Sequence, residues 1–124
     1  MNQRYGKAEK LKQKKHIDLL FSDGKAIGQF PVRLFHLPIV SKNQEQPTLT
    51  GVSVSKRNFK KAVDRNKIKR LLREAYRKNK YLVNDPNGKR YWLMLLYVGK
   101  EIPELKVLEI AVIKVLKKLN NLEK

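Results

Sequence analysis

The chain of 124 residues contains no cysteine and only two histidines. Without cysteine it can form neither disulfide bonds nor thiolate metal sites, and a reducing compartment, the cytoplasm, fits this composition best. A nuclease site carried by the protein needs paired acid and base groups or clustered carboxylates that bind Mg²⁺. Because His16 and His36 stand alone and the 11 acidic residues are scattered, we expect no such site and no metal held tightly by the protein alone.

Long apolar runs are also missing. The longest, "YWLMLLYV" at 91–98, is far shorter than the roughly 20 residues that a helix needs to span a bilayer. The basic N-terminus, "MNQRYGKAEKLKQKK", lacks the apolar run of a signal peptide. We therefore expect a cytoplasmic protein that is neither exported nor inserted in a membrane.

Positive charge is abundant, with 29 Lys and Arg and a formal net charge of +18. The apolar content of 41% and the length predict one folded domain over residues 1–124, with 1–7 flexible and loops over 41–49 and 84–90. Such an excess of one charge destabilises the compact state by self-repulsion. A polyanionic partner is the natural source of neutralisation.

The hydrophobic patterns predict an α+β fold, a single-domain two-layer sandwich in the order α-β-β-α-β-α, with a small mixed sheet and a central basic helix. The predicted elements are a helix over 8–22 that stops at Gly24, strands over 30–40 and 49–56, a helix from the N-cap Asn58 to about 79, a strand over 91–98 and a helix from Pro103. The strand at 30–40 contains prolines, which predicts a place near the sheet edge. The strand at 91–98 is apolar on both faces, which predicts the centre.

The basic helix, which contains "DRNKIKRLLREAYRK", has two distinct faces. Polar and cationic side chains within an arc of about 140° are Arg65, Asn66, Lys69, Arg70, Arg73 and Arg77. The neighbouring arc is apolar and consists of Ile68, Leu71, Leu72, Ala75 and Tyr76. Between residues 56 and 80 the only acids are Asp64 and Glu74, and Glu74 is predicted to point away from the cations. The helix is therefore predicted to dock by one face and offer phosphate-binding guanidinium groups on the other.

The stretch "VSVSKRNFKKAVDRNKIKRLLREAYR" resembles the protein subunit of bacterial ribonuclease P, and the resemblance extends to "LKQKKHIDLLFSDGK" and "FPVRLFHLP". The family motif usually reads Arg-Asn-Arg, whereas this chain has Arg65-Asn66-Lys67, which keeps the charge and loses the guanidinium fork. The resemblance implies a ribosomal-protein-S5-like superfold, including a left-handed crossover between parallel strands.

The resemblance also implies a function: a cofactor protein for a catalytic RNA that removes the 5′ leader from precursor tRNA, with Mg²⁺ held mainly by the RNA. No obligate protein partner is expected. The residues implied to contact the catalytic RNA are Lys56, Arg57, Lys60, Lys61, Arg65, Asn66, Lys67, Lys69, Arg70, Arg73 and Arg77. Those implied to line a cleft for the single-stranded leader are Ile17, Phe21, Arg33, Phe35 and Ser53, with Ile17 standing where the family commonly has Phe.

Single-stranded nucleic acid is held by a cationic groove together with exposed aromatic rings, and Tyr5, Phe21 and Phe35 are candidates. Phe21 is equally compatible with core packing, whereas Trp92 and Tyr97 are predicted to belong to the core. Composition alone leaves three other functions open: a ribosomal or other structural RNA-binding protein, a DNA-binding module, and a membrane-surface protein.

Overall fold

The computed structural model describes residues 10–11, 13–39, 48–83 and 90–122. In chain order the elements are α1 (Lys14–Asp23), β1 (Lys25–Gln29), β2 (Val32–Ile39), β3 (Leu49–Val54), α2 (Ala62–Asn79), a short 3₁₀ turn (Lys80–Leu82), β4 (Arg90–Tyr97) and α3 (Leu105–Leu122). The α+β class is confirmed, with one strand, β1, more than the predicted order. The predictions for residues 1–7 and for most of 41–49 and 84–90 fall outside the described residues.

The four strands lie in the order β1-β2-β4-β3, antiparallel except for the parallel pair β3–β4. The central place of β4 is confirmed. Strand β2, predicted near the sheet edge, lies second from the edge, because β1 pairs with Val32–His36 on its outer side. The prolines that suggested an edge lie where no β1 partner is needed: Pro31 is in the turn between β1 and β2, and Pro38 lies beyond the end of β1.

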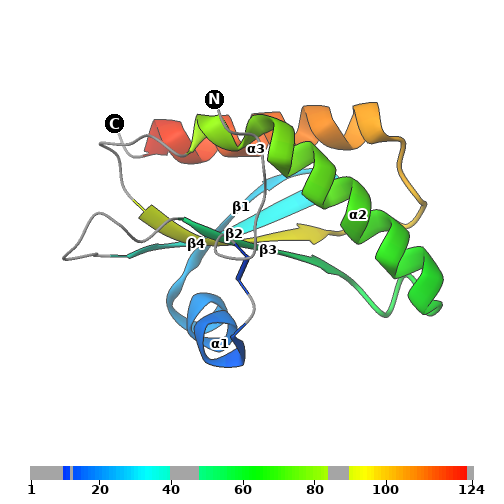
Figure 1. Ribbon diagram of the computed structural model, residues 1–124, viewed down its shortest axis with the longest axis horizontal. Helices are drawn as coiled ribbons and strands as arrows, with labels where there is room; N and C mark the ends of the chain where they lie inside the picture. Colours follow the sequence, from blue (N-terminus) through cyan, green and yellow to red (C-terminus); the bar gives the residue numbers. More distant parts are fainter. Residues whose placement is uncertain (1–9, 12, 40–47, 84–89, 123–124) are drawn as a thin grey trace.

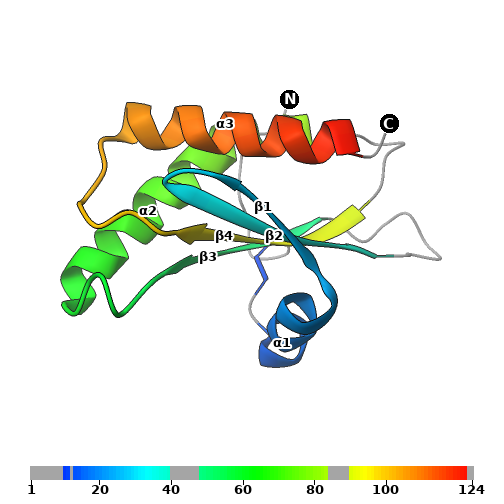
Figure 2. The ribbon, with the colours of Figure 1, turned by 180° about the vertical axis from the view of Figure 1, so that it is seen from behind.

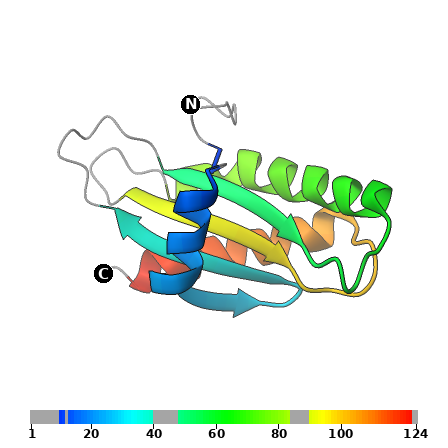
Figure 3. The same cartoon turned by 90° about the horizontal axis from the view of Figure 1, so that it is seen from below.

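Helices cover both faces of the sheet (Figures 1 and 2). Helices α2 and α3 lie together on one face, and α1 lies on the other. The predicted two-layer sandwich is therefore extended by α1, which crosses the strands on its own side (Figure 3). Successive side chains of a strand point to opposite faces, so one sheet contributes to a core on each side. In β2, Val32 and Leu34 join the core under α2 and α3, whereas Phe35 packs with the smaller cluster under α1.

The larger core confirms the predicted apolar faces of both long helices. Its fully buried helical residues are Ile68, Leu72, Ala75 and Tyr76 from α2 and Leu108, Val112, Val115, Leu116 and Leu119 from α3. They pack on Leu93 and Leu95 of β4. The smaller cluster joins Leu11, Leu20 and Met94 under α1.

The connection from β3 through α2 to β4 is left-handed. Viewed from the side of α2 with both strands pointing upward, β4 lies to the left of β3 (Figures 1 and 3). Almost all crossovers between parallel strands have the opposite hand. The crossover implied by the resemblance is thus present.

Three predicted helix starts shift toward the C-terminus. Helix α1 begins at Lys14, because the preceding chain runs beside β3, where the Leu11 N–H donates to the Thr50 carbonyl at 3.0 Å. Helix α2 begins at Ala62 with Lys61 at the N-cap, and the predicted N-cap Asn58 instead donates its amide to the Gly99 carbonyl at 3.3 Å. Helix α3 begins at Leu105, two residues after Pro103.

Gly24 ends α1 as predicted, but not through a left-handed conformation, since its φ is −77°. Its N–H donates to the Leu20 carbonyl at 2.9 Å. A Cβ at this position would lie 2.3 Å from that carbonyl oxygen and 2.9 Å from the His36 oxygen. Close approach of helix and sheet therefore requires the glycine.

Candidate nucleic-acid interface

The outward side of α2 carries several exposed cations. Lys67, Arg70 and Arg73 are exposed, as is Asn66, while Ile68, which directly follows Lys67 on another face of the helix, is fully buried. Within the described ranges, the side chains of these three cations have no hydrogen-bond or ion-pair partner. We define the basic surface as Lys56, Arg57, Lys60, Lys61, Asn66, Lys67, Lys69, Arg70 and Arg73. Its members are exposed except Lys69, which is half-buried.

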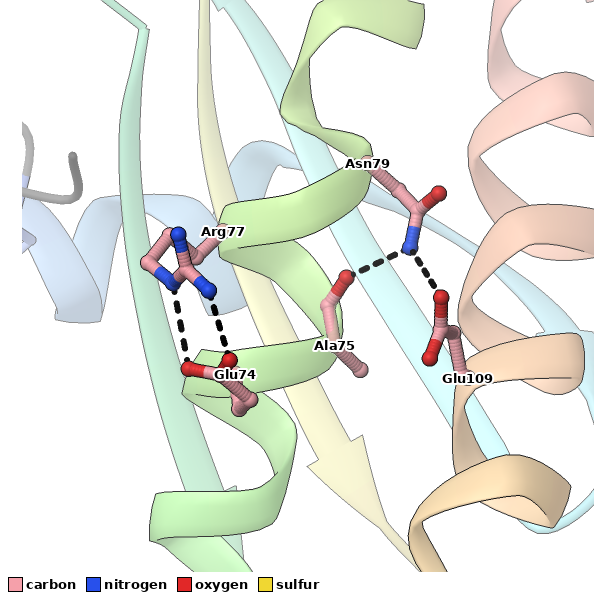
Figure 4. Close-up of polar contacts among 5 residues, drawn as sticks. All are labelled: Glu74, Ala75, Arg77, Asn79 and Glu109. Carbon is pink, nitrogen blue, oxygen red and sulfur yellow. Dashed lines mark hydrogen bonds and ion pairs between the residues drawn. The ribbon is translucent and has the colours of Figure 1, made fainter. Parts of the chain in front are cut away.

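Arg77 differs from the other predicted phosphate ligands because Glu74 neutralises it (Figure 4). Arg77 Nη2 lies 2.6 Å from Glu74 Oε1, and Nε donates to Oε2 at 3.1 Å. The prediction that Glu74 points away from the cations is therefore wrong: an arginine side chain spans the single turn that separates i from i+3. The hydrogen bond from Arg77 holds the pKa of the Glu74 carboxyl below its ordinary value.

A second acid meets the end of α2 from α3 (Figure 4). The buried Asn79 amide donates to the Ala75 carbonyl at 2.8 Å and to Glu109 Oε1 at 3.3 Å. Because Glu109 lies on the α3 side, this contact fastens the C-terminal turn of α2 to the core and leaves the exposed face of α2 unobstructed.

Arg65, also predicted to contact RNA, is turned toward its own chain. It is half-buried, and its Nη1 donates to the carbonyls of Phe59 at 2.9 Å and Lys60 at 2.8 Å. The sequence gives no signal for this contact, since both acceptors are backbone atoms before the helix.

The face of the sheet that carries α1 gathers the residues predicted for the leader. Phe21 is 46% exposed and meets Phe35 edge-on, with ring centroids 4.7 Å apart and planes at 68°. Arg33 and Ser53 both pair with Leu96 of β4, one from each side, so their side chains share this face. Ile17 packs against the small cluster on the same face of the sheet. We define the aromatic surface as Ile17, Phe21, Arg33, Phe35 and Ser53.

Two further predictions about rings have different outcomes. Tyr97 is buried, as predicted, and donates its O–H to the Glu101 carbonyl; burial raises its pKa. Trp92 is half-buried on the α1 side and stacks on His16, with ring centroids 4.3 Å apart. It packs against the small cluster and is only partly buried. Tyr5 lies outside the described residues.

A pocket of about 700 Å³ opens between the β1–β2 turn and the start of α3. Its lining includes the apolar residues Phe30, Val98, Ile102 and Val107 together with the charged residues Lys100, Glu101 and Glu104. No residue of the basic or the aromatic surface lines it.

Neither a metal cluster nor a membrane segment is evident in the part of the chain that the structure describes. There, no three His, Asp or Glu residues are grouped as ligands for an ion. The described helices include none that is long and apolar enough to cross a bilayer.

Comparison with known proteins gives a consistent result. The Ribonuclease P family model matches residues 5–120. The ribonuclease P protein component of Porphyromonas gingivalis is 36% identical over 108 residues, which cover 85% of this chain and 78% of that protein. Among solved structures, the RNase P protein from Thermotoga maritima superposes with a TM-score of 0.71 at 22% identity over 89% of this chain and 96% of its own. The RNase P protein of Staphylococcus aureus superposes with a TM-score of 0.70 at 22% identity, over 91% of this chain and 96% of its own.

Proposed function

Because the chain belongs to the ribonuclease P protein family, we propose that it grips two RNA elements at once, the catalytic RNA by its basic surface and the 5′ leader of precursor tRNA by its aromatic surface. Family membership carries with it the RNA-binding role in 5′ maturation of tRNA. The observation that supports two separate RNA contacts is that the two surfaces lie on opposite faces of the sheet. The sheet places α2 on one face and Phe21, Phe35 and α1 on the other, so neither contact obstructs the other.

The basic surface suits a phosphate backbone. Guanidinium and ammonium groups that have no partner within the described ranges neutralise phosphates and release counterions, so affinity should fall steeply with salt. Such contacts fix position and do not read sequence. In this proposal the protein screens the repulsion between two RNAs, and the catalytic RNA, which holds most of the Mg²⁺, performs the hydrolysis.

The aromatic surface suits a short single strand. The exposed part of Phe21 offers a ring on which a base can stack, and Phe35 supports that ring from the sheet. Stacking contributes roughly 1–3 kcal/mol per base. Arg33 and Ser53, one register position along the same face, supply a cation and a hydroxyl for the adjacent phosphate.

The alternatives that composition left open can be separated from this proposal. A membrane-surface role needs an unpacked apolar helix face, whereas the apolar face of α2 is buried against the sheet and α3. A ribosomal or other structural RNA-binding protein would bind RNA without stimulating cleavage. A DNA-binding module would prefer duplex DNA to the catalytic RNA.

The decisive experiment combines this chain, a bacterial ribonuclease P RNA and a precursor tRNA at low Mg²⁺. We expect the protein to restore accurate 5′ cleavage that the RNA alone performs poorly under these conditions. RNA binding without stimulation would favour the structural alternative. Cleavage by the protein in the absence of the RNA would contradict the RNA-catalysed part of the proposal.

The aromatic surface is tested by Phe21→Ala, with Phe30→Ala as the matched control. Phe30 is 77% exposed in the β1–β2 turn and lies outside both surfaces. We expect Phe21→Ala to weaken binding of the leader-bearing precursor to the assembled holoenzyme by about 1–3 kcal/mol. Binding of mature tRNA, which has no leader, should not change. Normal leader binding combined with an earlier thermal transition would instead assign Phe21 to the core.

A further inference from the structure

The segment at 55–61, between β3 and α2, concentrates charge without regular secondary structure. Lys56, Arg57, Lys60 and Lys61 are exposed within six consecutive positions. Like charges at this density repel one another. In a flexible segment the four cations would therefore have no fixed positions. Something must hold this segment if its cations are to meet RNA in a fixed arrangement.

Three hydrogen bonds and one ring contact fix the first half of the segment. The Arg57 N–H donates to Ser55 Oγ at 3.2 Å, and the Phe59 N–H donates to the Ser55 carbonyl at 3.1 Å. The amide of Asn58 reaches the Gly99 carbonyl, and the buried Phe59 ring lies 6.0 Å from the Tyr97 ring. The second half, which leads into α2, has no side-chain cap, because Lys61 occupies the N-cap position.

Arg65 supplies the missing contact. Its Nη1 donates to the carbonyls of Phe59 and Lys60, and its own N–H donates to the Lys61 carbonyl at 3.2 Å. A cation in the first turn of a helix is electrostatically unfavourable, because that end of the helix dipole is positive. Two charge-assisted bonds to carbonyls that precede the helix offset this cost.

We infer that Arg65 is a positioning residue: its guanidinium clamps the segment at 55–61 and thereby sets where the four cations of that segment meet RNA. The inference rests on the proposed function only for the second half of this statement. It separates Arg65 from Arg70, which is exposed on the next turns of α2 and has no partner within the described ranges. Both arginines belong to the same motif region, yet one faces its own backbone and the other faces outward.

The test compares Arg65→Lys with Arg70→Lys, which keep the net charge and remove the guanidinium fork. Hydrogen exchange is measured on the free protein, without RNA, at the amides of Phe59 and Arg65. We expect Arg65→Lys to raise their exchange rates by roughly tenfold or more. Arg70→Lys should leave them unchanged. Equal exchange in both variants would overturn the inference, whatever happens to RNA binding.

RNA binding gives the second readout. We expect Arg65→Lys to lower affinity for the catalytic RNA more than Arg70→Lys does, and to reduce the salt slope by more than the single contact that one direct phosphate ligand would contribute. Because the substitution keeps the charge, replacing one direct phosphate ligand should leave the salt slope nearly unchanged, so an unchanged slope would mean that Arg65 does not position the other four cations. If the wild type fails to bind RNA at all, the proposed function fails, and the exchange result still decides the clamp.

A measurement on the wild type avoids any dependence on the folding of a variant. The guanidinium protons of Arg65 should exchange with water more slowly than those of Arg70, because Nη1 of Arg65 is held by two carbonyls. Equal exchange of the two groups would also overturn the inference.

Discussion

Helices α2 and α3 have the same length, 18 residues, and lie side by side on one face of the sheet, yet they present opposite characters to solvent. Helix α2 carries four arginines, and α3 carries none. The outward side of α3 exposes Val107 and Ile110, and its Lys118 donates to the Gly28 carbonyl at 2.8 Å, so that cation serves the fold. The comparison shows that two helices with similarly buried apolar faces can differ in their outward side chains, and the proposed RNA contact rests on this difference.

Core substitutions test whether the two helices contribute equally to the stability of the fold. Leu72→Ala in α2 and Leu116→Ala in α3 each remove a fully buried side chain, so each should lower the free energy of unfolding by about 2–5 kcal/mol. Urea unfolding followed by circular dichroism measures both. The control is Val107→Ala, whose side chain is 52% exposed and whose loss should cost little. A small loss for either leucine would show that its helix contributes less to the core than its burial indicates.

The proposed difference in RNA binding between α2 and α3 can be tested by removing two positive charges from each helix. Arg70→Ala with Arg73→Ala on α2 should reduce the salt slope of binding to the catalytic RNA by about 2, since two phosphate contacts disappear. Lys114→Ala with Lys117→Ala on α3, also exposed, should reduce it far less. Filter binding over a range of KCl concentrations provides the slope. Equal losses from both pairs would mean that net charge, and not the arrangement on α2, drives binding.

The smallest effect is expected from the acid on α2. Glu74→Gln releases Arg77, which should then add up to one weak RNA contact and raise affinity slightly. Because the pKa of Glu74 is lowered in the folded state, its pair stabilises the fold above the unfolded-state pKa and loses that effect as pH falls through the folded value. Solvent screening keeps this contribution small. Urea unfolding at pH 7 and pH 3 should show less pH dependence in the variant, and an unchanged difference would exclude the pair as its source.

The sequence predicted what depends on periodicity. The apolar stripe of α2 and the two-sided burial of β4 follow from residue spacing, and both are present. The helix start was missed because Asn58 finds a partner 41 positions away in Gly99, a contact that no local pattern reveals. Strand β1 was missed because a five-residue stretch with an internal glycine becomes a strand only by pairing with β2.

The sequence predicted which residues belong to the candidate site better than it predicted how their side chains are arranged. The cations of α2 could be placed on one side from the sequence, but the partners of Arg65 and Arg77 depend on side-chain reach, which a helical wheel does not describe. The exposure of Phe21 depends on where α1 crosses the sheet. The hand of the β3–β4 crossover also had no signal in composition or spacing.

Strand β4 separates β2 from β3 in the sheet although it follows both in the chain. A growing polypeptide that has emerged only as far as α2 therefore holds a lone hairpin and an unpartnered strand, neither of which is stable in water. The most cationic helix of the protein is thus synthesised before its supporting surface exists. Completion of the sheet and ordering of the basic surface become one late, cooperative event, so a ribosome-bound fragment that ends before residue 90 should lack an ordered basic surface.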